Sequence, residues 1–161
     1  MSDKMVAFFS ASGVTKALSE RLAGLIGADL FEIVPEQIYT KSDLNWINPR
    51  SRSSVEMKDT SSRPAISSKI ENIDNYKYIF VGFPVWWYRE PSIIDTFLES
   101  YNFEGKVIIP FCTSGSSKIG KSADNMRTLA PKATVLEGLR FAKKVPDDEL
   151  KSWAEDKMKE A

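Results

Sequence analysis

Short apolar segments alternate along the chain with segments in which apolar residues recur every three or four positions. The first kind is typical of buried strands, and the second kind is typical of helices with one buried face. Strands are expected at residues 4–9, 30–34, 78–83, 106–112 and 134–139. Helices are expected after residue 16 up to Gly27, after Pro91, at 122–129 and at 147–159. This alternation predicts an α/β fold with a doubly wound, five-stranded parallel sheet and helices on both faces.

Residues 36–75, between the second and third expected strands, break this pattern. The stretch is polar, rich in Ser, Arg, Asp and Pro, and long for a connection inside a compact domain. Disorder is one interpretation, but Trp46 and Val55 are suited to packing. We therefore expect a long polar insertion that contains short helices near residues 43–58 and 66–73.

Pro110 stands inside the fourth expected strand. Proline has no N–H group to donate to a neighbouring strand, and central strands rarely contain it. The residue therefore predicts a bulge or an early end to the strand pairing.

The composition is that of a globular protein, and its length of 161 residues suits one domain spanning 1–161. The 22 basic and 22 acidic side chains give zero formal net charge, which predicts no general attraction to nucleic acid or to an anionic membrane. No apolar run approaches the length of a membrane span. The first residues lack the apolar core of a signal peptide. We interpret the protein as cytoplasmic.

Two residue counts limit the chemistry. The chain contains no histidine, and Cys112 is its single cysteine. An internal disulfide, a cysteine-built metal site and the Ser-His or Cys-His nucleophile systems are thereby excluded. An enzyme of this composition is expected to take its reactive group from a bound cofactor, and we interpret Cys112 as structural.

The first strand leads directly into Ser10-Ala11-Ser12-Gly13-Val14-Thr15, where a helix begins. A phosphate group needs several hydrogen-bond donors in a small space, and a helix N-terminus offers free N–H groups. The hydroxyls of Ser10, Ser12 and Thr15 would add donors, and Gly13 would let the backbone approach closely. The alternative is an ordinary turn whose hydroxyls cap the helix. The segment alone does not decide between the two interpretations.

Three adjacent aromatic residues, Trp86, Trp87 and Tyr88, follow the third strand. They cannot all enter the core from one loop, so at least one is expected to present a flat face on which a planar ring can stack. The alternative interpretation is a core plug or a homodimer contact.

A third loop, from Cys112 to Gly120, follows the fourth strand and is rich in small hydroxyl residues. Its backbone amides could hydrogen-bond the polar edge of a planar heteroaromatic ring, although alone it is typical of any flexible loop. All three loops follow strands. In an open parallel sheet they therefore lie at the carboxyl edge, where ligands bind.

The hydroxyl–any–hydroxyl–glycine–any–threonine pattern of residues 10–15 resembles the phosphate loop of flavodoxins. The segments 82–87 and 110–116 and the stretch 43–64 are similar to those of a bacterial flavodoxin-like subfamily. The resemblance implies strand order 2-1-3-4-5 and bound FMN. The FMN residues that it implies are Ser10, Ser12, Gly13, Val14, Thr15, Pro84, Val85, Trp86, Trp87, Tyr88, Thr113, Ser114, Gly115, Ser116 and Gly120.

The resemblance implies a flavin-binding protein, and three hypotheses about its function stay open, two of them redox functions and the third not. The first is an oxidoreductase that passes electrons from NAD(P)H through FMN to a quinone or similar acceptor, with Arg50 and Arg89 as candidates for gripping an anionic substrate. The second is an electron carrier that docks on a redox protein, and the third is a flavin-binding regulatory module. Electron-carrying flavodoxins are typically acidic, whereas this chain is neutral. No glycine lies between Phe83 and Pro91 to permit a peptide flip, so the one-electron-reduced flavin is not expected to be strongly stabilised.

Overall fold

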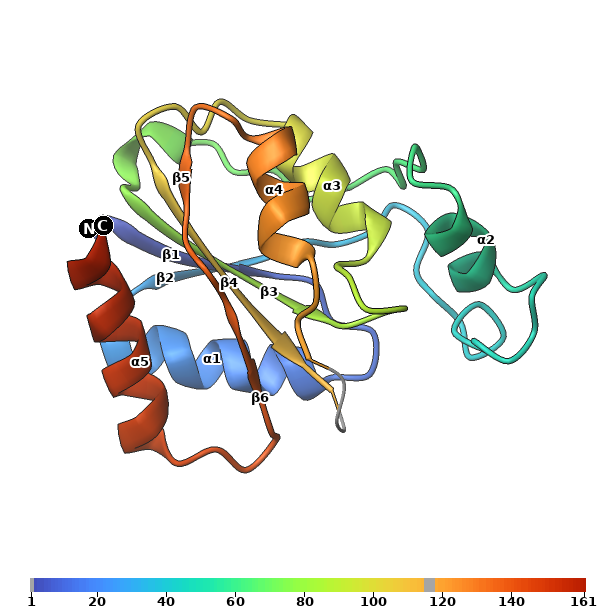
Figure 1. Cartoon of the computed structure of the whole chain (residues 1–161), viewed down its shortest axis with the longest axis horizontal. Helices are drawn as coiled ribbons and strands as arrows, with labels where there is room; N and C mark the ends of the chain where they lie inside the picture. The colour runs from blue at the N-terminus through green and yellow to red at the C-terminus, as the bar shows by residue number, and fades with distance from the viewer. Residues whose placement is uncertain (1, 115–117) are drawn as a thin grey trace.

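A computed structural model describes residues 2–114 and 118–161. Its centre is a parallel sheet (Figure 1) in the order β2-β1-β3-β4-β5, with β6 pairing on β4. The strands are β1 (Lys4–Phe8), β2 (Asp29–Glu32), β3 (Tyr78–Pro84), β4 (Val107–Thr113), β5 (Thr134–Val135) and β6 (Leu139–Phe141). Every pair of neighbouring strands is parallel. The predicted α/β fold and its strand order are confirmed.

Helices cover both faces of the sheet. α1 (Val14–Ile26) and α5 (Asp147–Glu160) lie together on one face, and α3 (Ser92–Glu99) and α4 (Ser122–Leu129) lie on the other (Figure 1). α1 ends where Gly27 adopts a left-handed conformation, as the sequence predicts. None of the described helices is both long and apolar enough to cross a membrane.

The sheet divides two hydrophobic cores because successive strand residues point to opposite faces. Val6 and Phe80 face α1 and α5, where Leu22 and Leu150 are fully buried. The alternate positions of the strands pack with Ile93, Phe97 and Met126 of α3 and α4. Burial of both faces explains the continuous apolar runs of β1, β3 and β4.

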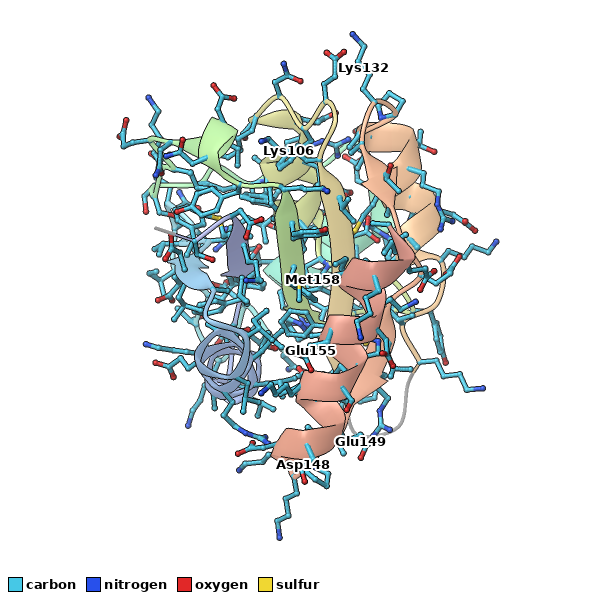
Figure 2. All side chains as sticks on the ribbon, turned by 90° about the vertical axis from the view of Figure 1, so that its left-hand side faces the viewer. Lys106, Lys132, Asp148, Glu149, Glu155 and Met158 are labelled. Carbon is cyan, nitrogen blue, oxygen red and sulfur yellow. The ribbon has the colours of Figure 1, made fainter. Side chains whose placement is uncertain are left out.

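α5 is stabilised by its charges and packed on the sheet through one aromatic residue. Figure 2 shows Asp148 and Glu149 at one end of the helix and Met158 near the other. Acidic residues occupy the first turn and lysines the last, which stabilises a helix through its dipole. Trp153 packs edge-on against Phe141, with ring centroids 5.0 Å apart. The helix is thereby fixed over the end of the chain's last strand.

Pro110 forms no bulge, so that part of the prediction is wrong, but the predicted early end to the pairing occurs on the β5 side, where the pairing of β4 with β5 ends at Ile108. The pairing of β3 with β4 runs in register from Val107 to Thr113, with Pro110 opposite Val81. The N–H of Val107 donates to Lys77 on the β3 side. By the two-residue alternation of a strand, the nitrogen of Pro110 faces the other neighbour. No ladder bond to β3 is therefore lost.

The last strand differs from the single segment predicted at 134–139. β5 contains only two residues, and β6 begins at Leu139. Between them Gly138 lies close to the carbonyl of Pro110, which is 2.3 Å from the position that a Cβ atom on Gly138 would occupy. The proline therefore faces a gap between two short strands, where its missing N–H leaves no partner strand unpaired.

The insertion is folded, but its helical content is lower than predicted. α2 (Arg52–Lys58) forms the second half of the helix expected at 43–58. The first half consists of turns, in which the side chains of Asn45 and Asn48 accept hydrogen bonds from backbone N–H groups two residues ahead. Such local acceptors compete with helix formation. Pro49 further disfavours helical geometry at the preceding residue.

The helix predicted at 66–73 is wrong. Ile66 forms an isolated antiparallel bridge with Pro35, and Ser67 donates its N–H to the carbonyl of Val34. The hydroxyl of Ser68 also accepts from the N–H of Val34. This extended stretch continues beside the end of β2. Only a 3₁₀ turn follows it, Ile73–Asn75.

Candidate functional site

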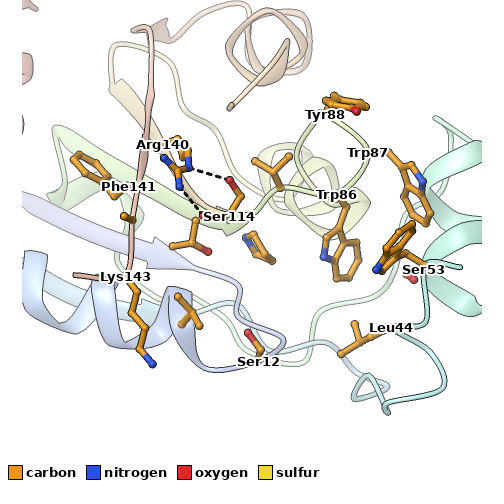
Figure 3. A pocket seen from close by; sticks show the side chains of 16 residues that line it. Ser12, Leu44, Ser53, Trp86, Trp87, Tyr88, Ser114, Arg140, Phe141 and Lys143 are labelled. Atoms are coloured by element: carbon orange, nitrogen blue, oxygen red, sulfur yellow. Dashed lines mark hydrogen bonds between the residues drawn. The ribbon is translucent and has the colours of Figure 1, made fainter. Parts of the chain in front are cut away.

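A cavity of about 810 Å³ opens at the carboxyl edge of the sheet (Figure 3). Its lining includes predicted cofactor residues from all three loops, namely Ser12, Val14, Pro84, Val85, Trp86, Trp87, Tyr88, Thr113 and Ser114. The insertion adds Leu44, Trp46 and Ser53. β6 and the two residues after it add Arg140, Phe141, Ala142 and Lys143. Its size falls within the range of cofactor and small-ligand pockets.

The loop after β1 leaves the N-terminus of α1 open. Gly13 adopts a left-handed backbone conformation with φ +96°, and its N–H donates to Ser10 Oγ at 3.0 Å. No described side chain caps the first turn of α1, and that turn contains no acidic residue. Ser12 is exposed and lines the cavity. Free N–H groups beside an exposed hydroxyl form a suitable site for an anion; the capping alternative is not what the loop adopts.

Thr15 has a different position from its neighbours in the loop. Its side chain is buried, with 1% exposure, and its Oγ1 lies 2.7 Å from Thr113 Oγ1 at the end of β4. The contact joins the first loop to the third. Ser10, Gly13 and Thr15 thus shape the loop, whereas Ser12 and Val14 face the cavity.

The aromatic loop is a tight turn with an unusual backbone. Trp86 and Arg89 exchange two backbone hydrogen bonds, of 3.1 and 3.2 Å. The two residues between them have positive φ, 47° for Trp87 and 66° for Tyr88. Turns of this kind ordinarily use glycine or asparagine, and each bulky residue at positive φ costs about 1–3 kcal/mol. Such strain is concentrated at binding sites.

The three aromatic residues divide their tasks. Trp86 is half-buried and packs edge-on against Phe9 and Tyr39, with centroid distances of 5.7 and 5.4 Å. Trp87 and Tyr88 remain 41% and 73% exposed. Packing of Trp86 therefore anchors the turn, and the other two aromatic side chains are exposed at the cavity, as the sequence predicts.

The third loop supports the aromatic turn. Gly120 has φ +65°, and a Cβ atom there would lie 2.0 Å from the carbonyl oxygen of Tyr88. Gly120 therefore acts by close approach and does not line the cavity. The predicted ligands Gly115 and Ser116 lie outside the described residues.

The insertion forms one wall of the cavity, which the sequence did not predict residue by residue. The N–H of Ser53, at the start of α2, donates to the carbonyl of Asp43 at 2.9 Å. The guanidinium of Arg52, the preceding residue, lies 3.8 Å from the centre of the Tyr39 ring. These contacts hold α2 beside the aromatic turn (Figure 3). Leu44 and Trp46 are apolar residues within a polar stretch, and this was the sequence signal that the insertion contributes to the cavity.

The opposite wall comes from β6 and the residues after it. Arg140 donates from Nε to Ser114 Oγ and from Nη2 to Ser114 O, both at 3.1 Å (Figure 3). Lys143 lies near it on the same wall. Sequence reasoning ended the last strand at Leu139 and did not include these two cations. Their position just beyond a strand was a usable signal.

Neither arginine predicted to grip a substrate lines the cavity. Arg50 is exposed in the turn before α2. Arg89 is 13% exposed and lies 3.5 Å from the Asp95 carboxylate, while its Nη2 donates to the carbonyl of Met57. Arg89 therefore links the aromatic turn to α2 and α3.

Comparisons with known proteins agree with this geometry. The flavodoxin family model matches residues 3–157. A candidate flavoprotein from Bacteroides eggerthii is 43% identical, with a TM-score of 0.91 over 96% of this chain and 97% of that chain. One from Bacteroides uniformis is 40% identical, with a TM-score of 0.89 over 94% and 97%.

A Lactobacillus acidophilus flavoprotein solved in complex with FMN is 22% identical, with a TM-score of 0.70 over 94% and 97% of the two chains. No curated protein matches the chain. The family match covers nearly the whole sheet and its three loops. The chain belongs to the flavodoxin family.

Proposed function

We propose that the cavity binds FMN and that the protein is an FMN-dependent oxidoreductase. It passes electrons from NAD(P)H to a quinone or a similar small acceptor. The observation that carries the proposal is the meeting of Ser12, Trp86 and Ser114, from the loops after β1, β3 and β4, in one cavity. The flavodoxin family match and the FMN complex of the Lactobacillus acidophilus flavoprotein support the choice of cofactor.

Each wall has a chemical task in this proposal. The open N-terminus of α1 and the Ser12 hydroxyl hold the phosphate, and Trp86 and Trp87 offer apolar faces to the ring system. No Asp, Glu or Cys is among the described lining residues. The flavin supplies the redox chemistry when bound, and the chain supplies binding, orientation and the exclusion of water.

A single substitution tests the phosphate site. Ser12→Glu places a carboxylate where the phosphate is expected, so it should weaken FMN binding by at least about a hundredfold through like-charge repulsion. Riboflavin, which lacks the phosphate, should lose little affinity. Both dissociation constants are measured by flavin fluorescence quenching. Ser152→Glu, on the exposed face of α5, is the matched control and should change neither constant.

The outcomes separate the alternatives. Equal loss for FMN and riboflavin would place the phosphate elsewhere. A purified protein that remains colourless after FMN is added would reject the FMN site and favour a regulatory module. Unchanged FMN affinity in Ser12→Glu would also overturn the assignment.

The second candidate function is electron transfer to a protein partner. Five large apolar side chains among the described residues, those of Ile38, Trp46, Ile47, Val55 and Tyr88, are between 55% and 74% exposed. Two of them, Trp46 and Tyr88, also line the cavity. Exposed apolar residues beside a redox site suit transient docking.

Anaerobic stopped-flow mixing with NADPH distinguishes the two functions. If the protein is an oxidoreductase, NADPH should bleach the flavin absorbance at least as fast as the enzyme turns over. The absorbance should return when a quinone is added. A carrier is reduced slowly by NADPH, accumulates the one-electron-reduced flavin and needs a reductase. Rapid bleaching without reoxidation by quinones would support the NADPH step and reject the proposed acceptor.

A further inference from the structure

The walls of the cavity differ in charge. The wall at the aromatic turn and the insertion includes Trp86 and Trp87, and the opposite wall carries Arg140 and Lys143 (Figure 3). Among the described residues, the lining contains these two cations and no acidic side chain. The chain as a whole is neutral, so the cationic wall is a local property of the site. An occupant that gains negative charge is stabilised there.

Arg140 is held in place. It is half-buried, and its guanidinium makes two hydrogen bonds to Ser114, one to the hydroxyl and one to the carbonyl. Ser114 directly follows β4 and belongs to the loop whose amides are expected to face the flavin pyrimidine ring. A guanidinium fixed in this way acts on its surroundings without first losing side-chain freedom.

The field of Arg140 already affects a neighbouring group. Burial raises the pKa of the Cys112 thiol to about 12, and the positive charge of Arg140 acts in the opposite direction. The charge of Arg140 therefore acts on the thiol in the direction that favours its anion, although burial is the larger effect.

We propose that Arg140, assisted by Lys143, makes the cavity bind the reduced flavin anion more tightly than the oxidised flavin and so raises the reduction potential of the bound cofactor. This inference rests on the proposed FMN site. Two electrons and one proton convert the neutral oxidised ring system into an anion, and the electrons come from NAD(P)H. The negative charge that remains on the pyrimidine ring is the charge that Arg140 meets.

The test compares oxidised and reduced flavin in Arg140→Gln, with riboflavin as well as FMN. Arg140→Gln should weaken binding of the reduced form by roughly tenfold more than binding of the oxidised form. For a two-electron couple, that difference corresponds to a potential lower by about 30 mV. Spectroelectrochemistry gives the potentials, and fluorescence quenching gives the dissociation constants of the oxidised forms.

Two further variants separate charge from loop support. Arg140→Lys keeps the positive charge but loses the pair of hydrogen bonds to Ser114. The reduction potential of its bound flavin should therefore stay close to that of the wild type. Arg127→Gln is the matched control, because it removes an arginine paired with Asp124 and Glu137 outside the cavity, and it should leave the potential unchanged.

Several results would overturn the inference. If Arg140→Gln weakens binding of the oxidised and reduced flavin equally, Arg140 only supports the loop. If it weakens binding of FMN but not of riboflavin, Arg140 holds the phosphate. A wild-type protein that binds FMN while Arg140→Gln leaves its potential unchanged rejects the inference but not the FMN site. A wild-type protein that fails to bind FMN rejects the proposed function itself.

Discussion

The hydroxyls of Thr15 and Thr113 lie 2.7 Å apart and join the start of α1 to the end of β4. The two residues are 98 positions apart in the sequence, and both are buried. The hydrogen bond fixes the distance between the loop expected to hold the phosphate and the loop expected to face the flavin ring. This contact at the edge of the cavity therefore adds to the strand pairing of β1, β3 and β4 in setting the spacing of the two loops.

Thr15→Val should lower the free energy of unfolding by about 1–3 kcal/mol, because it leaves the Thr113 hydroxyl buried without its partner. The double variant Thr15→Val/Thr113→Val should lose less than the sum of the two single variants. Chemical denaturation measures the three values. Thr128→Val removes an exposed hydroxyl from α4 and should change stability by less than about 0.5 kcal/mol. Additive losses in the double variant would contradict a direct coupling.

Gly120→Ala should weaken FMN binding and reduce stability. Its Cβ atom would be placed 2.0 Å from the Tyr88 carbonyl, in a left-handed conformation that disfavours side chains. The aromatic turn must then move away from the cavity. Gly24→Ala is the matched control, since nothing lies within 4 Å of that position inside α1, and it should stabilise the protein by about 0.5–1 kcal/mol. Unchanged FMN affinity in Gly120→Ala would show that the turn does not depend on this contact.

Asp95 should make stability fall as the pH rises from about 4 to 9. Burial, followed by the hydrogen bond and negative charge of Glu90, raises the pKa of Asp95 to about 9, while Arg89 and Arg63 oppose the rise. Among the described donors, none reaches Asp95 Oδ1, so this buried oxygen has no donor to stabilise a negative charge. The unfolded chain loses the Asp95 proton near its ordinary pKa of 3.8. Unfolding in this range therefore releases a proton.

One proton of this kind contributes a slope of up to about 1.4 kcal/mol per pH unit. Asp95→Asn keeps the shape and a donor for Glu90 but cannot ionise, so the fall in stability between pH 5 and pH 9 should become smaller. Denaturation midpoints across this range measure the effect. Glu99→Gln, which alters an exposed partner of Arg63, should leave the slope in place. An unchanged slope in Asp95→Asn would mean that Asp95 is already ionised in the fold.

Cys112 should resist alkylation in the folded protein. Its side chain is fully buried, and burial raises its pKa to about 12, so little of the reactive thiolate exists at pH 8. Mass spectrometry after iodoacetamide treatment should show no adduct under native conditions and one adduct in denaturant. Rapid labelling of the native protein would contradict the burial of this residue.

The sequence predicted the parts of the site that depend on strand ends. The apolar runs of β1, β3 and β4 locate three loops, and parallel pairing brings them to one edge, so Ser12, Trp86 and Ser114 could be grouped. The second strand and the insertion were harder, because their local pattern is weak. Asn48 and Ser68 are fixed by hydrogen bonds within and across loops that no periodic pattern records.

Backbone strain and contacts between residues distant in the sequence also could not be predicted from the sequence. The sequence showed that the aromatic turn lacks glycine but not that Trp87 and Tyr88 adopt positive φ, between the two backbone hydrogen bonds that join Trp86 and Arg89. Arg89 was interpreted as a substrate residue. Its burial against Asp95 arises from α3, whose packing the local sequence does not describe.

The division of the last strand into β5 and β6 has a consequence for solubility. A long unpaired border on a parallel sheet would offer a template on which strands of other molecules could add and begin to aggregate. Here that border contains two residues, a gap at 136–138 and three more residues. Such an interrupted border offers too few consecutive N–H and C=O groups to recruit another strand, and it protects a neutral protein that has little charge repulsion to keep its copies apart.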